Sequence, residues 1–479
     1  MDEKAGAQIS KKAFIQSFLI LLLLMIVAGV LTRVLPAGSF DRFLQDGRTV
    51  IDPTSFKLTD PVNLPIWRWF TAPVGTLWGP DALVIITIIV FILLVSSAFA
   101  VLDKSGILKA TLGKIVNKFG GRKYVLLLVV SLFFMLMGAL FGLFEEIVPL
   151  VPLMIALAYS LGWDALVGLG MSILATNMGF SAAITNPFTI GVAQKLAGLP
   201  YPSGALFRVP IFLAVYAALA WFLVSYARKI DRNPEASLIF KEDQADRKRY
   251  SAITFESNAN LGRAGIFFGV FIVLIILVLF STSVVPFLAD YSLPIVGLLF
   301  FIGGLGAGFI SGAKGKVIGH ALLEGMGGMA PGIPLILMAA SIKLIITNGG
   351  VMDTILQSSS TLLQGASPLS AVLIIYLLAL LMELFIGSAG AKAVLMMPIL
   401  LPLADLVGVT RQLTVTAYCF GDGFSNLAYP TNPVLLIAIG LASVGYGKWM
   451  KFTWKLWAVI IPITVFFLWL GSVIGYGPF

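Results

Sequence analysis

Two polar segments interrupt long apolar stretches of this sequence, and both end in the same three residues. Residues 175–187 read ATNMGFSAAITNP, and residues 421–433 read GDGFSNLAYPTNP. A helix that stopped inside a bilayer would leave backbone groups that no water could satisfy. Where such helices do stop, their ends usually line a polar cavity, and many transporter sites are built in this way. The two segments therefore predict a pair of broken transmembrane helices beside a binding site for a small solute.

Polar side chains at the two breaks supply oxygen ligands for a cation. Asparagine, threonine, serine and aspartate oxygens suit Na⁺, whereas Asp422 alone could carry a proton. The same side chains could also simply cap the ends of the broken helices. We expect substrate contacts from Asn186, Asn426, Thr431 and Asn432, and a Na⁺ site near Asn177, Thr185, Asp422 and Ser425.

Two further candidate groups lie where long apolar runs are interrupted. The first, FGLFEE, places Glu145 and Glu146 at the start of a helix. Carboxylates there can cap the helix, or they can contact a cation, a proton or a substrate amine, because ionisable residues inside a membrane are usually functional. In the second, backbone N–H groups at residues 388–391 can bind a carboxylate. We expect substrate contacts from Ser388, Gly390 and Lys392, with Lys392 as a counter-charge for the glutamate pair.

The composition excludes a soluble domain. Apolar residues make up 59% of the chain and charged residues 11%, and many apolar runs exceed the roughly 20 residues of a transmembrane helix. One cysteine and one histidine exclude a disulfide framework and a zinc or haem site. The net charge of +9 resides in loops beside apolar runs, which is the positive-inside pattern rather than a nucleic-acid surface. Lys4, Lys11 and Lys12 accordingly place the N-terminus in the cytoplasm.

The apolar runs predict an all-α polytopic membrane protein made of two repeats. The first repeat, 1–230, holds helices at 14–35 and 82–102, a re-entrant hairpin at 124–160, a broken helix at 165–195 and a helix at 206–227. Residues 231–262 form a cytoplasmic linker. The second repeat, 263–479, holds helices at 264–281, 294–311 and 330–347, a hairpin at 368–407, a broken helix at 412–444 and a last helix at 454–475. Between 311 and 330 we expect only a short cytoplasmic segment.

An internal repeat relates the two halves. Aligning Gly162 with Gly408 also aligns the two Thr-Asn-Pro motifs. The lysine-rich segment 103–123 then corresponds to 348–366, which contains no lysine or arginine. By the positive-inside rule these two segments face opposite sides of the membrane. Inverted repeats with opposed hairpins and broken helices predict a site near the middle of the bilayer.

Several segments of the sequence resemble a known family. They are GLFEEIVPLVPLMIALAYSLGWDALVG, GFSAAITNPFTIGVA, MPILLPLADLVGVTRQ and AYCFGDGFSNLAYPTNPVLL. Over nearly its whole length the chain resembles the YfcC-type branch of the DcuC-like carriers, in the ion transporter superfamily. The resemblance implies an elevator-type secondary transporter of the bacterial inner membrane that works as a homodimer. Members are named for uptake of four-carbon dicarboxylates or for antiport of basic amino acids, so the resemblance leaves the substrate open.

These observations favour a secondary active transporter of small organic anions or amino acids. It would be driven by Na⁺ or H⁺ or by exchange, would need no other cofactor, and would contact a small-molecule substrate and the lipid bilayer but no nucleic acid. A channel-like facilitator is the first alternative. Hairpins whose turns meet in the middle of the bilayer, however, favour an occluded site over a continuous pore. A membrane-embedded enzyme is the second. No metal motif or nucleophile–base pair accompanies Glu145 and Glu146, so we expect no catalytic residues.

Overall fold

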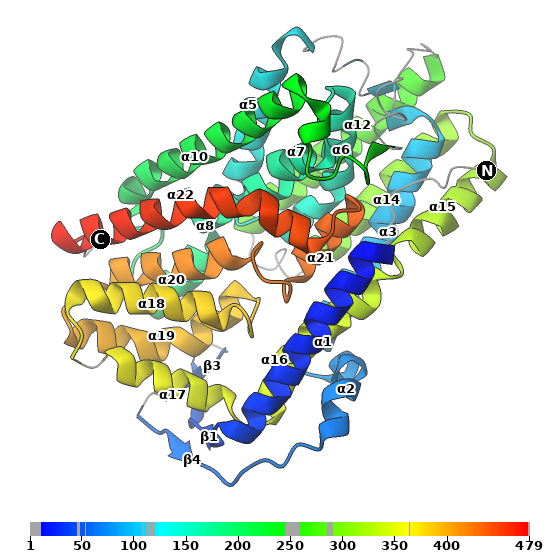
Figure 1. The fold of residues 1–479 in the computed structure, drawn as a ribbon. Helices are drawn as coiled ribbons and strands as arrows, with labels where there is room; N and C mark the ends of the chain where they lie inside the picture. The colour runs from blue at the N-terminus through cyan, green and yellow to red at the C-terminus, as the bar shows by residue number, and fades with distance from the viewer. Residues whose placement is uncertain are drawn as a thin grey trace.

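The computed structural model describes residues 11–45, 48–52, 54–108, 110–111, 114, 120–244, 259–284, 291–363 and 365–477. Within these residues the protein is almost entirely helical (Figure 1). Nine of the described segments are long and apolar enough to cross a membrane, and two apolar helical segments, Ala165–Ser181 and Pro368–Met382, are shorter. The prediction of an all-α protein is confirmed.

The N-terminal part places one long helix on either side of a polar loop. Helix α1 (Lys11–Val34) forms from the first apolar run. The loop after it contains two antiparallel strand pairs, β1–β4 and β2–β3, with β1 at Gly38–Ser39, β2 at Arg42–Gln45, β3 at Arg48–Ile51 and β4 at Lys57–Leu58. The tryptophan-rich segment forms α2 (Ile66–Gly75) and the turn η1 (Thr76–Trp78). Helix α3 (Ala82–Lys104) follows, and its second half is buried.

Helices α12 (Ala259–Val284), α14 (Ser292–Ile310) and α16 (Gly332–Asn348) form from apolar runs of the second half. The short segment expected before α16 is instead a helix, α15 (Gly315–Met329), packed against α3. Its glycines are poor helix formers, but they allow a close approach. The Ser96 hydroxyl of α3 donates to the Gly325 carbonyl at 2.8 Å, and a Cβ on Gly325 would lie 2.5 Å from the Ser96 carbonyl oxygen. Close packing against α3 therefore stabilises a helix whose glycine content makes it hard to predict from the sequence.

Residues 123–163 form two helical arms that turn at Gly142. The first arm is α5 (Lys123–Leu136) with the π-helical turn η3 (Met137–Phe141), and the second is the 3₁₀ turn η4 (Glu145–Leu150) with α6 (Val151–Ser160). Gly142 ends the first arm with φ at 69°, a left-handed conformation that glycine adopts without strain. The rings of Tyr124 and Trp163 lie 5.9 Å apart. The second arm therefore returns to the place where the first arm starts.

Residues 368–408 form a second pair of arms. They are α18 (Pro368–Met382) and α19 (Ala389–Leu406), which lie side by side (Figure 1). A Cβ on Gly408 would lie 3.9 Å from the Pro368 ring, so this pair also starts and ends at one place. Helix α17 (Met352–Leu363) precedes it. The buried Asp353 of α17 pairs with Arg42 of strand β2 at 2.7 Å, which attaches α17 to the polar loop.

A broken helix follows each pair of arms. The first consists of α7 (Ala165–Leu169), η5 (Gly170–Leu174) and α8 (Ala175–Ser181), then, after a break, η6 (Pro187–Gly191) and α9 (Val192–Leu196). The second consists of α20 (Arg411–Ser425) and α21 (Pro433–Leu441). Asp164 caps α7 by accepting a hydrogen bond from an N–H three residues later, and Thr410, its counterpart in the internal alignment, caps α20 in the same way. The two broken helices are thus built alike.

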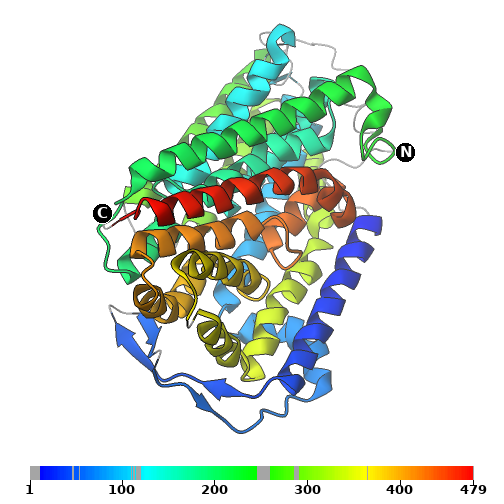
Figure 2. The same ribbon diagram turned by 60° about the vertical axis from the view of Figure 1, so that its left-hand side comes forward.

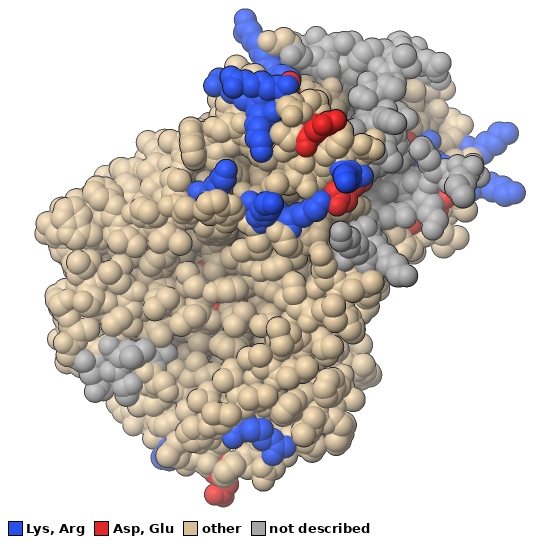
Figure 3. Space-filling model, in the orientation of Figure 1, with Lys and Arg blue, Asp and Glu red and all other residues tan. Residues whose placement is uncertain are grey.

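Two long helices, α10 (Ala205–Arg232) and α22 (Tyr446–Val473), lie side by side across the molecule (Figure 1, Figure 2). Each has 28 residues and is therefore about 42 Å long. Lys and Arg side chains gather where α10 ends and α22 begins, while most of the remaining surface in this view is uncharged (Figure 3). The short turns η2 (Gly120–Arg122) and η7 (Pro234–Ala236) complete the described elements.

The bases of the two pairs of arms lie at opposite ends of α10. Near its C-terminal end, the Tyr226 hydroxyl donates to Asp164 at 2.8 Å, next to the base of the first pair. Just before its first residue, the Gly204 carbonyl accepts from the Tyr476 hydroxyl at 2.9 Å. The Tyr476 carbonyl in turn accepts from Thr410 at 2.5 Å, next to the base of the second pair. The two pairs therefore enter the molecule from opposite ends.

Three predicted features lie wholly or partly outside the described residues. The N-terminal lysine Lys4 is one, and the lysine-rich segment, of which residues 109, 112, 113 and 115–119 are not described, is another. The third is the predicted linker at 231–262, of which residues 245–258 are not described. Before that gap α10 extends to Arg232, and after it α12 begins at Ala259.

Candidate functional site

Two asparagines, Asn186 and Asn432, begin the second halves of the broken helices. Each side-chain oxygen accepts from the backbone N–H groups two and three residues ahead, at 2.9 and 3.2 Å for Asn186 and at 2.9 and 3.4 Å for Asn432. A helix start leaves such N–H groups unsatisfied, and an asparagine cap satisfies them. Both asparagines thus have the capping geometry that was the expected alternative to substrate contact.

One backbone carbonyl in each break accepts a hydrogen bond from a side chain of α10 or α22. Arg208 of α10 is 2% exposed, and it donates to the Ile184 carbonyl at 3.0 Å and to the Tyr476 hydroxyl at 3.1 Å. In the second break, the Trp449 ring N–H donates to the Leu427 carbonyl at 2.8 Å. Arg208 was not among the site residues predicted from the sequence. An arginine inside the apolar run 206–227 was the signal that could have found it.

Three ionisable side chains meet in the second half of the protein, and we call them the charge triad: Glu383 at the end of α18, Lys392 in α19 and Asp422 in α20. The Lys392 ammonium donates to Glu383 and, at 2.8 Å, to Asp422. All three side chains are at most 1% exposed. The second oxygens of the two acids, Glu383 Oε1 and Asp422 Oδ2, are also buried and accept no hydrogen bond of ordinary geometry.

The charge triad differs from the expected pairing of Lys392 with the glutamates of the other tip. Glu383 lies on the opposite side of the same turn, so the turn itself brings Glu383 and Lys392 together. Glu146 is buried and accepts from the Phe144 N–H at 3.2 Å, as a local cap would. Glu145 is half-buried, and no cation among the described residues pairs with it. Its carboxylate and that of Asp422 are close enough to repel each other.

The two tips, residues 142–146 and 388–392, approach the same residue, Phe188 at the start of η6. A Cβ on Gly142 would lie 2.8 Å from the Phe188 ring, and a Cβ on Gly390 would lie 3.9 Å from the Phe188 carbonyl oxygen. Ser388 is exposed and caps α19 through a 3.5 Å contact with the Ala391 N–H. The start of α19 is therefore accessible. Acidic atoms are also visible within a recess near the middle of the face in Figure 3.

The residues expected near Na⁺ have separate contacts. The hydroxyls of Ser425 and Thr185 donate to backbone carbonyls, at 2.6 and 2.9 Å, and Asp422 accepts from Lys392. The Asn177 side chain is fully buried, and neither of its polar atoms has a hydrogen-bond partner. In the part of the chain that the structure describes, no group of three or more His, Cys, Asp or Glu residues could hold a metal ion.

Comparison with known proteins identifies the family. The family model described as "C4-dicarboxylate anaerobic carrier", DcuC, matches residues 14–473. The chain belongs to the DcuC family. It is therefore a multi-pass membrane carrier rather than an enzyme, and the resemblance noted in the sequence is confirmed at the level of the family.

Two individual relatives of this DcuC-family chain share less than 30% sequence identity with it. YfcC of Escherichia coli (strain K12), provisionally named a basic amino acid antiporter, is 29% identical over 471 residues, which cover 91% of this chain and 92% of YfcC. An uncharacterized protein of Haemophilus influenzae is 27% identical over 397 residues, which cover 81% of this chain and 74% of that protein.

Two solved structures show a weak overall likeness. MtrF of Neisseria gonorrhoeae, from a class described as antimetabolite efflux pumps, has a TM-score of 0.44 at 18% identity, with 94% of this chain and 93% of that chain covered. The YdaH transporter of Alcanivorax borkumensis has a TM-score of 0.39 at 20% identity, with 97% and 99% covered.

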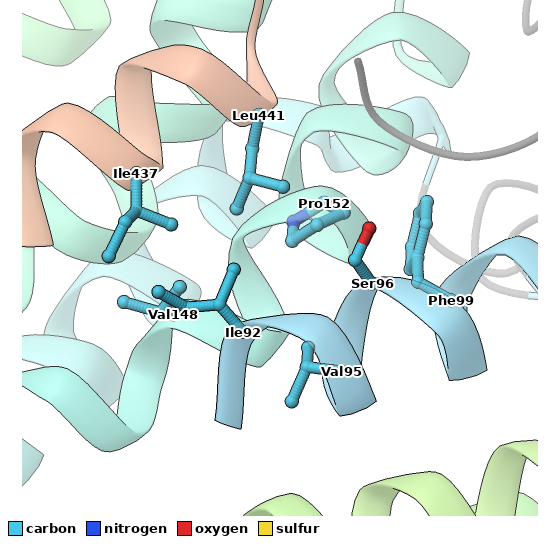
Figure 4. A pocket seen from close by; sticks show the side chains of 8 residues that line it. All are labelled: Ile92, Val95, Ser96, Phe99, Val148, Pro152, Ile437 and Leu441. Carbon is cyan, nitrogen blue, oxygen red and sulfur yellow. The ribbon is translucent and has the colours of Figure 1, made fainter. Parts of the chain in front are cut away.

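A narrow apolar crevice in this DcuC-family chain lies where α3 meets η4, α6 and α21 (Figure 4). Its volume is about 10 Å³, which is room for about one water molecule. The hydroxyl of Ser96, its polar lining side chain, already donates to the Gly325 carbonyl. A crevice of this size and chemistry offers nothing to a charged solute, so the tips are the better candidate site. Its lining residues are Ile92, Val95, Ser96, Phe99, Val148, Pro152, Ile437 and Leu441.

Proposed function

We propose that this DcuC-family protein is a secondary active transporter of amino acids in the bacterial inner membrane. Its two halves are inverted repeats, each with a re-entrant hairpin and a broken helix. Support comes from the positions of the two hairpin bases, at opposite ends of α10. The matching caps of the broken helices, Asp164 with Thr410 and Asn186 with Asn432, support the same relation between the halves.

The proposed substrate class follows from the two tips. An amino acid carries a carboxylate and an ammonium group close together. The backbone N–H groups at the start of α19, near Ser388 and Gly390, attract the carboxylate because a helix N-terminus carries partial positive charge. Glu145, which pairs with no described cation, accepts the ammonium. The observation that carries this proposal is that both tips lie against Phe188, so one small molecule can contact both.

The remaining predicted site residues fit supporting roles in this proposal. Asn426 accepts from the Asn432 amide at 3.1 Å, and Thr431 is half-buried beside it, so both line the second break. The hairpins and broken helices carry the substrate by moving against α1, α3, α14 and α16. The mainly apolar lining of the crevice at α3 supports such a boundary, because apolar contacts are non-directional and break no hydrogen bonds when they slide. The protein works as a homodimer with its N-terminus in the cytoplasm.

The test uses purified protein and a panel of ligands. A thermal-shift screen of basic, neutral and acidic L-amino acids, with succinate and fumarate beside them, selects the ligand, and counterflow in proteoliposomes then measures its exchange. For L-lysine two matched analogues exist: cadaverine lacks the carboxylate, and 6-aminohexanoate lacks the α-ammonium group. We expect an amino acid to exchange saturably. If it is L-lysine, neither analogue should compete.

Variants test the role of Glu145 directly. Glu145→Gln should lower amino-acid exchange by about tenfold or more, because a charge-assisted hydrogen bond is worth about 1.5–3 kcal/mol. Glu235→Gln, on an exposed turn, is the matched control and should exchange at the wild-type rate. Exchange of succinate with all amino acids inert would replace the proposal by dicarboxylate transport. Flux that never saturates would indicate a channel.

A further inference from the structure

We propose that the charge triad binds one coupling proton, so that transport by this protein is driven by H⁺. The use of this proton in transport rests on the proposed function. The proton site itself stands on the contacts of Glu383, Lys392 and Asp422 alone, so it can be tested without any substrate.

The charge triad is not balanced. It contains two carboxylates and one ammonium, and both carboxylates accept hydrogen bonds from that same ammonium. No other described cation bonds to either acid. All three side chains are at most 1% exposed. An uncompensated charge in such an interior is so unfavourable that the group neutralises by taking up a proton. With Lys392 charged, the triad is neutral only when one carboxylate is protonated.

The structure also leaves a place for this proton. Glu383 Oε1 and Asp422 Oδ2 are buried, and neither accepts a hydrogen bond of ordinary geometry, although the Asn432 amide lies near Glu383. A proton on either oxygen neutralises the triad without displacing the ammonium. Because both acids bond the same ammonium, the proton belongs to the group rather than to one residue.

A metal cation fits the triad poorly. The Lys392 ammonium bonds both carboxylates at once, and this is the position that a metal ion bridging them would take. Hard cations need several oxygen ligands, whereas the positive charge of Lys392 repels any second cation. The lysine thus stands in for a coupling metal, and only a proton is small enough to be added beside it.

The charge triad is tied to the tip that is proposed to bind substrate. Glu383 follows the last residue of α18 and Lys392 lies in the first turn of α19, so the second tip lies between them. One turn before Asp422, the Tyr418 hydroxyl donates to the Ala389 carbonyl of the same tip at 2.5 Å. Loss of the proton changes the charge on both sides of this tip. Proton binding and substrate binding are therefore linked through one short segment.

Other titratable groups around the triad do not supply the missing positive charge. They are Glu145 of η4, Tyr418 and Cys419 of α20, and Tyr429 in the second break. None of these side chains becomes a cation. Glu145 repels Asp422 and so makes a fully ionised triad still less favourable.

Infrared difference spectroscopy of the full-length protein in detergent tests the site. The measured signal is the carbonyl stretch of a protonated carboxyl group at neutral pH, identified by its shift in heavy water. Wild type minus Glu383→Gln and wild type minus Asp422→Asn should each show this band, because removing either carboxylate balances Lys392 and releases the proton. Asp353→Asn is the matched control, because Asp353 is a buried acid already balanced by Arg42 at 2.7 Å. Its difference spectrum should lack the band.

Three results would overturn the proposal. One is a wild-type spectrum without a protonated carboxyl band, which needs no variant to fold. Another is an unchanged band in both triad variants. The third is a band that disappears when K⁺ in the buffer is replaced by Na⁺, which would assign the site to Na⁺. A negative transport screen would contradict the proposed function but would leave these spectra unaffected.

Discussion

A lysine buried between two carboxylates makes the second half of the protein sensitive to single charges. Lys392 is fully excluded from solvent, and its ammonium connects α18, α19 and α20. Replacing a whole buried ion group by apolar residues is often neutral, whereas removing one member leaves uncompensated charge. The balance among the three side chains therefore matters more than any one contact.

Lys392→Met should destabilise the protein strongly, because it leaves two buried carboxylates without a cation. We expect a loss of about 3–5 kcal/mol, seen as a lower melting temperature by intrinsic fluorescence in detergent. Lys57→Met is the control: Lys57 pairs with Asp41 at 3.2 Å, but both side chains are about 70% exposed. Such surface pairs contribute about 0–1 kcal/mol. Equal losses in the two variants would contradict the assigned role of Lys392.

At the scale of elements, glycines set how closely the broken helices cross the arms. A Cβ on Gly179 of α8 would lie 1.8 Å from the Met135 carbonyl oxygen of α5. A Cβ on Gly138 of η3 would lie 2.1 Å from the Thr176 carbonyl oxygen of α8. Both obstacles are backbone atoms, which cannot move aside as a flexible side chain can. The backbones of the first pair of arms and of the first broken helix are therefore in direct contact.

Gly179→Ala should separate α8 from α5 and destabilise the protein by about 1–3 kcal/mol or more. Gly319→Ala in α15 is the matched control, because nothing lies within 4 Å of a Cβ at that position. There alanine should be neutral, or stabilise by up to about 1 kcal/mol through its higher helix propensity. Melting temperatures of the two purified variants decide the matter. A harmless Gly179→Ala would show that the two helices do not lie this close.

In the whole molecule, the contacts of α10 place the two pairs of arms at its opposite ends. The first hairpin base lies at the C-terminal end of α10 and the second at its N-terminal end. Lys and Arg side chains gather at only one of these two ends in Figure 3. By the positive-inside rule, we expect this basic end to face the cytoplasm. The surface segments 103–123 and 348–366 should then lie on opposite sides.

Single cysteines test this arrangement in the Cys419→Ala background. A cysteine at Lys114 and a cysteine at Ser358 occupy exposed positions in the two surface segments. A membrane-impermeant maleimide added to intact cells should label only the cysteine at position 358, and both should react after the cells are opened. Labelling of both positions from one side would contradict the inverted relation between the halves.

The parts of the fold that depend on local signals could be predicted from the sequence. The breaks at 182–186 and 426–432 lie inside the segments 175–187 and 421–433, which are recognisable in the sequence as polar stretches with glycine and proline between apolar runs. Helix α15 could not be predicted in this way, because its glycines lower helix propensity and only packing against α3 compensates. Lys392 and Asp422 were named as candidate site residues from the sequence, but their contact with each other and with Glu383 was not predicted. No local pattern shows this contact, because only the packing of α20 brings Asp422, 30 residues away in the chain, to Lys392.

The short arms have a consequence for how the chain is made. Helix α18 has 15 residues and is about 22 Å long, whereas the hydrocarbon core is about 30 Å thick. When this segment leaves the ribosome, it is too short to be inserted across the bilayer as an independent transmembrane helix. It has to stay near the translocon until α19, α20 and α22 have been synthesised and can enclose it. Helices of this carrier therefore cannot be inserted strictly in chain order. The last helix, α22, helps to enclose α18, which starts about 80 residues earlier in the chain.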